Sequence, residues 1–287
     1  MNQVIQSNEY DALIKKIQHK RKVVIVLTII AVLITITACS PIYIGFLNKT
    51  IIDYKGINPI FTVLLVLLIF FFEIIAYALV SIPLTTSMDL ECNPRKHLTL
   101  NVVLNKQKNI DHIYTTDFIY MGNFEAALNY ANKMIASNKP AMMITGLFNK
   151  ARCEFFLGDF DSLKATVKQY ESALNNMKKL NQKAKDAYNK ILKTMNLLVA
   201  ISEENKEAIS NFSGIEVWNN SKATQGYINY LKGIAAYMAE DKKEAIYRFM
   251  SVKENCEKTV FAEKSQQYLL KMSAEISIGA TCQKSTS

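Results

Sequence analysis

Apolar residues are concentrated in two long runs near the N-terminus of the chain. Residues 23–47 and 60–84 contain one charged side chain between them, Glu73. At 1.5 Å of rise per residue, each run forms a helix long enough to cross a hydrocarbon core of about 30 Å. The pattern predicts transmembrane helices over residues 23–47 and 60–84, joined by an external loop over residues 48–59.

The basic residues that flank the two runs predict their orientation. Residues 1–22 form a basic N-terminal segment with five Lys or Arg side chains, whereas the loop has only Lys49 and Lys55. A second basic cluster lies in the juxtamembrane linker expected over residues 85–109. Because an excess of Lys and Arg faces the cytoplasm, we expect a multi-pass protein of the cell membrane with both termini cytoplasmic.

Glu73 has two interpretations. In an antiparallel hairpin it lies at about the depth of Thr35, so a hydrogen bond between these two side chains would satisfy the carboxyl group. Alternatively, Glu73 contacts a basic residue of another membrane protein, or an ion. A single intramembrane acid, with no second charge in either run, disfavours transport by this chain alone.

The cysteines are scattered without any CxxC pair, which favours reduced thiols over disulfides or a zinc site. They are Cys39, Cys92, Cys153, Cys256 and Cys282. Residues 36–39 resemble a lipoprotein cleavage site, so lipidation of Cys39 is an alternative to the first span. Two features argue against lipidation: the apolar run continues past Cys39 to Leu47, and the segment before the apolar run is long for a signal peptide.

From residue 110 onward the pattern changes to short amphipathic segments separated by a recurring turn. In residues 120–128 and 156–163, an apolar helical run is followed by a Gly, a polar residue, an aromatic residue and an acid. Gly122 and Gly158 can adopt the left-handed conformation that ends a helix, and Asn123 and Asp159 can cap the helix that follows. Residues 196–209 and 233–246 repeat the pattern without Gly at the turn.

These turns resemble those of the tetratricopeptide repeat family over roughly residues 110–272. The resemblance implies an all-α fold, an α-solenoid of about four helix pairs over residues 110–276. The longest interval between turns predicts an extended helix over residues 177–201. A final amphipathic helix, about residues 260–272, would cap the last repeat, and we expect a disordered tail over residues 277–287.

The resemblance also implies that the first helix of each pair lines a concave groove that binds a protein or peptide. Carrying those positions over gives the candidate groove residues Tyr120, Phe148, Asn149, Arg152, Phe155, Lys190, Lys193, Asn229 and Tyr237. Aromatic, amide and basic side chains suit an extended peptide with some acidic character. Phe148 and Phe155 can equally be core residues. Only part of the two-carboxylate clamp of some family members is present, so a chaperone co-factor is not implied.

The charge pattern and the absence of catalytic motifs exclude several classes of function. The net charge is +9, but the lysines are interleaved with acids and not with exposed aromatic residues, so nucleic acid is disfavoured as a partner. The three histidines form no cluster, and no nucleotide-binding, metalloprotease or hydrolase motif is present, so we expect no cofactor, no metal and no enzymatic activity. The Lys-, Ile- and Asn-rich composition is consistent with a bacterial source.

The sequence therefore predicts a membrane-anchored adaptor whose cytoplasmic helical domain binds a partner protein or peptide at the inner leaflet. Two alternatives remain open: an accessory or immunity subunit of a membrane transport system that acts through Glu73, and a peptide sensor. The sequence indicates no oligomeric state.

Overall fold

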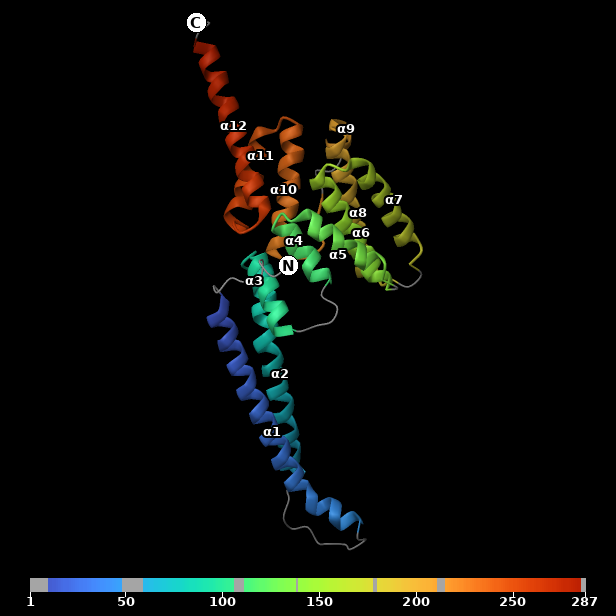
Figure 1. Ribbon diagram of the computed structural model, residues 1–287, viewed down its shortest axis with the longest axis vertical. Coiled ribbons are helices and arrows are strands. Elements are labelled where there is room, and N and C mark those ends of the chain that lie inside the picture. The colour runs from blue at the N-terminus through green and yellow to red at the C-terminus, as the bar shows by residue number, and fades with distance from the viewer. Residues whose placement is uncertain are drawn as a thin grey trace. The chain divides into compact units, whose positions relative to one another are not determined.

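The computed structural model describes residues 10–47, 59–105, 111–137, 139–177, 180–210 and 215–284. Within them, the side chains of residues 35–47, 59–62, 65, 80, 105 and 276–284 are not described. Every described element is helical, as the sequence predicts (Figure 1). The chain divides into two compact units, Met1–Leu84 with Val102–Lys106, and Thr85–Asn101 with Gln107–Ser287.

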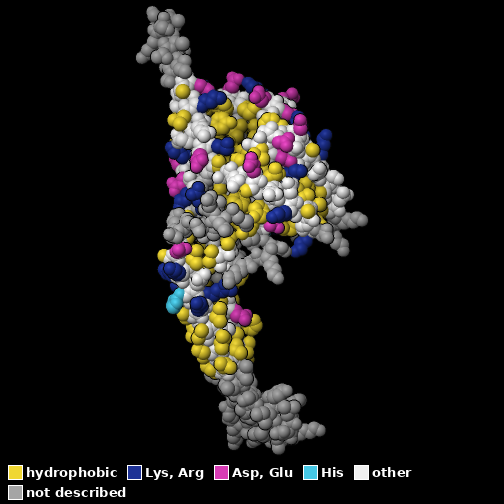
Figure 2. Space-filling model, in the orientation of Figure 1, with side chains coloured by type: hydrophobic (Ala, Val, Ile, Leu, Met, Phe, Trp, Pro, Cys, Tyr) yellow, Lys and Arg dark blue, Asp and Glu magenta, His cyan; other side chains and the backbone are white. Residues whose placement is uncertain are grey.

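The first unit is built on two long helices. Helix α1 spans Asp11–Leu47 and α2 spans Pro59–Asp89, so α1 starts well before the apolar run and α2 continues beyond it into the second unit. Many of their large apolar side chains are exposed, among them Ile29, Leu33 and Phe70. Figure 2 shows a broad apolar surface on this unit. Among the described residues, one segment, Val66–Asp89, is long and apolar enough to cross a membrane.

The segment expected to be a linker is instead largely helical and packed. After α2, the short helix α3 spans Pro94–Leu100 and a π-helical turn, η2, spans Asn101–Asn105. The side chain of Asn93 accepts a hydrogen bond from the backbone of Lys96 and caps α3, and Pro94 occupies its first turn. Leu98 and Leu100 are buried, which explains why this stretch packs with the helical domain and does not form an irregular tether.

A buried acid joins α3 to the first helix of the repeats. Nδ1 of His97 lies 2.9 and 2.8 Å from the two carboxylate oxygens of Asp117. Burial raises the pKa of Asp117 from 3.8 to about 6, and the hydrogen bond and charge of His97 oppose that rise. The pair therefore fixes α3 against the repeats at a polar point in an otherwise apolar contact.

Four helix pairs and a final helix follow. They are α4 (Asp111–Tyr120) with α5 (Phe124–Ile135), α6 (Pro140–Leu157) with α7 (Phe160–Asn175), α8 (Gln182–Ser202) with α9 (Lys206–Ser210), α10 (Lys222–Met238) with α11 (Lys242–Asn255), and α12 (Val260–Lys284).

All four turns within these pairs have the same geometry. A residue in the left-handed region ends the first helix, and the next residue caps the second helix through its side-chain oxygen. The left-handed residues are Gly122, Gly158, Glu204 and Glu240. The caps are Asn123, Asp159, Asn205 and Asp241, which confirms the two caps predicted from the sequence. Where Gly is missing, a glutamate adopts the less favourable left-handed conformation and the turn is kept.

Two expected boundaries differ from the structure. The extended helix begins at Gln182 and not near residue 177, because Asn181 accepts a hydrogen bond from the backbone of Ala184 and starts a new helix there. The tail expected to be disordered continues α12 as far as Lys284. Residues 276–284 contain no proline, so nothing in this stretch forces the helix to end.

The last helix packs against the first pair as well as against its own neighbour. The Phe261 ring, on α12, lies 5.2 Å from Tyr120 on α4 and 5.6 Å from Phe156 on α6, centroid to centroid. It also lies 5.1 Å from Tyr227 and 5.4 Å from Tyr230 on α10. In an open array each repeat contacts only its neighbours. Here α12 contacts the first helix of the first pair as well as α10, so it does more than cover the last helix pair.

We expect Phe261→Ala to destabilise the helical domain by about 3–5 kcal/mol, because the ring is 1% exposed and contacts four other rings. Urea unfolding of the detergent-solubilised chain, followed by the fluorescence of its single tryptophan, measures this change. Leu270→Ala on the same helix is the control: that side chain is 60% exposed, so its removal should change stability by less than about 0.5 kcal/mol. Equal effects of the two substitutions would contradict the closed packing.

We expect the contribution of Asp117 to stability to depend on pH. Its pKa is raised from 3.8 to about 6 in the folded protein, so its contribution is largest below about pH 4 and is lost as the pH rises through about 6. Relative to Asp117→Asn, which does not titrate, the wild type should lose roughly 3 kcal/mol of unfolding free energy between pH 4 and pH 7. Denaturation curves across this range test it, with Asp161→Asn as an exposed-acid control. A stability difference that rises with pH would refute the assignment.

Candidate functional site

Residues from the first helices of all four pairs line one cavity of about 280 Å³. We call it the Arg152 pocket. Its lining residues are Thr116 and Tyr120 from α4, Ile144, Thr145, Phe148, Asn149 and Arg152 from α6, Tyr188 and Ile191 from α8, Trp218 and Asn219 from the segment before α10, and Thr224 from α10. Four of the nine candidate groove residues, Tyr120, Phe148, Asn149 and Arg152, therefore lie together here.

Arg152 is the central residue of this pocket. It is only 2% exposed, and its guanidinium carbon lies 4.2 Å from the ring centre of Tyr227, 5.2 Å from that of Tyr120 and 5.3 Å from that of Phe148. Rings at these distances attract the cation through their negative faces and offset part of the cost of removing it from water. The neighbouring Asn149 is buried to the same degree.

The hydrogen-bonding capacity of Arg152 is mostly unused. Nη1 donates to Oδ1 of Asn149 at 3.3 Å, whereas Nε and Nη2 have no partner among the described residues. The Tyr227 hydroxyl is also buried, and it lies beside Arg152 without a hydrogen bond of standard geometry. Burial raises the pKa of Tyr227 to about 12, and the charge of Arg152 and hydrogen bonding with it oppose that rise. The pocket therefore contains a buried cation whose Nε and Nη2 lack well-formed hydrogen bonds, an arrangement that is costly in the absence of a ligand or water.

Nothing in the pocket is arranged for covalent catalysis. Burial raises the pKa of the adjacent Cys153 thiol to about 12, so it is protonated at neutral pH and is not a nucleophile. No group of three or more His, Cys, Asp or Glu side chains that could hold a metal ion occurs in the described part of the chain. The geometry suits recognition of a ligand.

Trp218 is the pocket residue that the sequence analysis missed. Its ring packs edge-on against Phe148 at 5.1 Å and lies 6.3 Å from Tyr227, centroid to centroid. It belongs to the non-helical residues 215–221 that precede α10, where no repeat position could be assigned. One feature of the sequence could have identified it: Trp218 is the single tryptophan of the chain, and it stands directly before Asn219 and Asn220 in a polar stretch.

Three further candidate groove residues lie outside the Arg152 pocket. Lys190 and Lys193 line a separate shallow hollow of about 530 Å³ on α8, where the amino group of Lys190 lies 2.7 Å from a carboxylate oxygen of Glu216. Phe155 packs against Phe156 and Phe160, with ring centres 5.1 and 6.3 Å away. Phe155 therefore matches the alternative that it is a packing residue.

The two candidates on α10 face its neighbouring helices. Asn229 accepts a hydrogen bond from Nη1 of Arg248 at 3.0 Å, and the Tyr237 hydroxyl donates to Glu275 at 2.9 Å. Both residues therefore form structural contacts with α11 and α12, and the expected groove does not extend along α10 to include them.

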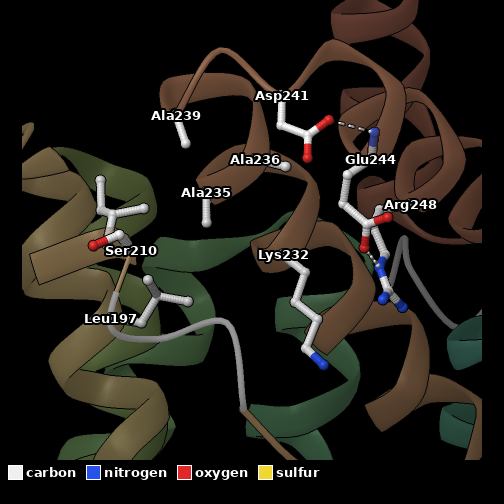
Figure 3. Close-up of a pocket in the computed structure, with 10 residues that line it drawn as sticks. Leu197, Ser210, Lys232, Ala235, Ala236, Ala239, Asp241, Glu244 and Arg248 are labelled. Atoms are coloured by element: carbon white, nitrogen blue, oxygen red, sulfur yellow. Dashed lines mark hydrogen bonds and ion pairs between the residues drawn. The ribbon is translucent and has the colours of Figure 1, made fainter. Parts of the chain in front are cut away.

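A second hollow, of about 190 Å³, lies between α8, α9, α10 and α11 (Figure 3). Its walls carry Leu197 and several alanines, together with the charged side chains of Lys232, Asp241, Glu244 and Arg248. Nε of Arg248 lies 2.7 Å from Glu244, and Asp241 accepts a hydrogen bond from the Glu244 backbone (Figure 3). Burial lowers the pKa of Lys232 on the opposite wall. Arg248 on its wall is already paired with Glu244, whereas the lining of the Arg152 pocket contains no acid.

The proposed intramembrane pair is described only in part. Glu73 is exposed on α2, while the side chains of Thr35 and Cys39 lie outside the described residues. The hydrogen bond between Glu73 and Thr35, and the lipidation of Cys39, therefore stay predictions.

With this geometry established, we compared the chain with protein-family models, curated proteins and solved structures, and none of them matches it.

Two tyrosines provide a matched test of the pocket's unused polar groups. The Tyr227 hydroxyl is buried beside Arg152 without a hydrogen bond of standard geometry, whereas the Tyr170 hydroxyl donates to the backbone oxygen of Tyr188 at 3.2 Å. We expect Tyr227→Phe to leave stability unchanged or raise it by up to about 1 kcal/mol, and Tyr170→Phe to lower it by about 1 kcal/mol. Urea unfolding of both variants measures the difference. A loss at Tyr227 as large as that at Tyr170 would mean that its hydroxyl is satisfied in the folded protein.

Proposed function

We propose that the chain is a membrane-anchored adaptor whose helical domain binds a protein or peptide partner at the cytoplasmic face of the membrane. The observation that supports binding is the Arg152 pocket, where side chains from α4, α6 and α8 meet around a buried cation with free donors. Recognition sites are typically concave and mostly apolar, with a few polar groups that fix orientation.

The apolar surface of α1 and α2 supports the membrane anchor. Soluble monomers rarely expose contiguous apolar surfaces of this kind, and burial in a bilayer would remove it from water. The basic residues before the first run support cytoplasmic termini. Fixing the helical domain to the membrane raises its effective concentration toward partners that also reside there, so an individually weak contact can suffice.

One observation favours a second candidate function. Glu73 is exposed on α2 within Val66–Asp89, the segment able to cross a membrane. A carboxylate that faces lipid is costly, so a second membrane protein that covers it would stabilise the helix. The chain would then act through its membrane helices, as an accessory or immunity subunit of a transport system.

Site-specific crosslinking in native membranes tests the adaptor function. A photoreactive benzoylphenylalanine replaces Tyr188 at the wall of the Arg152 pocket or, as a control, Tyr247, which is 63% exposed on α11. We expect one protein to be crosslinked from position 188 and not from position 247, because the partner occupies the pocket.

The substitution Glu73→Gln separates the two functions. If the adaptor function holds, this substitution leaves the crosslink from position 188 in place. No crosslink from position 188, together with loss of a co-purifying membrane protein in Glu73→Gln, would reject the adaptor and favour the second candidate.

A further inference from the structure

We propose that the Arg152 pocket binds one carboxylate group, which accepts two parallel hydrogen bonds from Nε and Nη2 of Arg152. The inference rests on the proposed function where that carboxylate belongs to a partner polypeptide. It applies equally to a small organic acid, because both present the same group.

The free donors have the geometry that a carboxylate requires. Nη1 is engaged by Asn149, so the unused pair is Nε and Nη2. The N–H bonds on one edge of a guanidinium point in parallel and match the two oxygens of a carboxylate. A single carbonyl or hydroxyl ligand would satisfy only one of the two donors.

The charge of the site selects a monoanion. The pocket lining contains Arg152 and no Asp or Glu, so the cation has no counterion in the wall. One carboxylate balances one guanidinium, whereas a phosphate dianion would leave an excess negative charge surrounded by low-dielectric walls. The site therefore differs from a clamp for two carboxylates, which needs several cations.

The other lining residues limit the chemical group to which the carboxylate of the ligand is attached. Phe148, Trp218, Ile144 and Ile191 provide apolar surface, and the volume of about 280 Å³ lies near the lower end for ligand sites. A short aliphatic or aromatic group fits this space. An extended peptide can insert only one side chain or one chain end.

A ligand can reach Arg152 only if neighbouring side chains move, and the movement of Trp218 can be measured by its fluorescence. Nε and Nη2 are closed off from water, and Trp218 packs on Phe148 and near Tyr227, two of the rings that flank the guanidinium. Because Trp218 lies on a non-helical stretch, its ring can move without unwinding a helix. It is the single tryptophan of the chain, so its fluorescence reports this pocket alone.

The experiment titrates the full chain in detergent micelles with two pairs of probes. The first pair is 3-phenylpropionate and its neutral amide. The second is a capped pentapeptide with one central glutamate and the same peptide with glutamine. We expect a saturable change in Trp218 emission, with at least about tenfold tighter binding of the acid in one or both pairs. A response to phenylpropionate alone assigns the site to small acids, and a response to the peptide assigns it to a partner's acidic residue.

Variants test whether Arg152 is the binding group. Arg152→Met should weaken binding at least about tenfold and keep or raise the midpoint of thermal unfolding, because it removes an uncompensated buried charge. Arg248→Met, an equal change of charge beside the second hollow, should change affinity less than about twofold. Asn149→Asp keeps Arg152 and places a carboxylate beside it. It should also weaken binding about tenfold, which gives an answer even if Arg152→Met fails to fold.

The proposal is overturned if neither acid produces a saturable change up to about 10 mM, if the amides bind as tightly, or if Asn149→Asp binds like the wild type. It is also overturned if Arg152→Met folds with a lowered unfolding midpoint and unchanged affinity, since Arg152 would then be a packing residue. A crosslink from position 188 that persists in this case would show that the adaptor function holds and the carboxylate assignment alone has failed.

Discussion

A charged guanidinium buried among aromatic rings is the constraint that the packing of the helical domain has to accommodate. Removing Arg152 from water costs free energy that the faces of Tyr120, Phe148 and Tyr227 offset only in part. Two of these rings, Tyr120 and Tyr227, also pack against Phe261 of the last helix. The contact that closes the helical array and the contact that holds the cation therefore share the same side chains.

The contacts of α12 distinguish this domain from an open helical array, which presents a long concave groove along its first helices. Here α12 packs against α4 and α6, and the residues of α4, α6, α8 and α10 nearby line a pocket of about 280 Å³. Lys190 and Lys193 then belong to a separate hollow, and α10 uses Asn229 and Tyr237 to hold α11 and α12.

Whether a feature could be predicted from the sequence depends on how far apart in the chain the interacting residues lie. The all-helical class and the caps at Asn123 and Asp159 depend on residues close in the chain, and both were predicted. The first-helix positions on α4 and α6 were also brought together, because neighbouring pairs stack locally. The contact between Tyr120 and Phe261 joins residues far apart in the chain, and no periodicity encodes it. Trp218 was missed for a related reason, since it enters the pocket from a stretch without a repeat position.

Helix α4 connects the pocket to the segment that follows the second long helix. Asp117 on one turn of α4 contacts His97 of α3, and Tyr120 less than one turn later flanks Arg152. A ten-residue helix is too short to bend much, so a displacement at one of these contacts moves the other. The cost of breaking the buried contact between His97 and Asp117 opposes independent motion of α3 and α4. Helix α3 and the wall of the pocket are therefore linked through α4 by one polar contact and one aromatic contact within the helical domain.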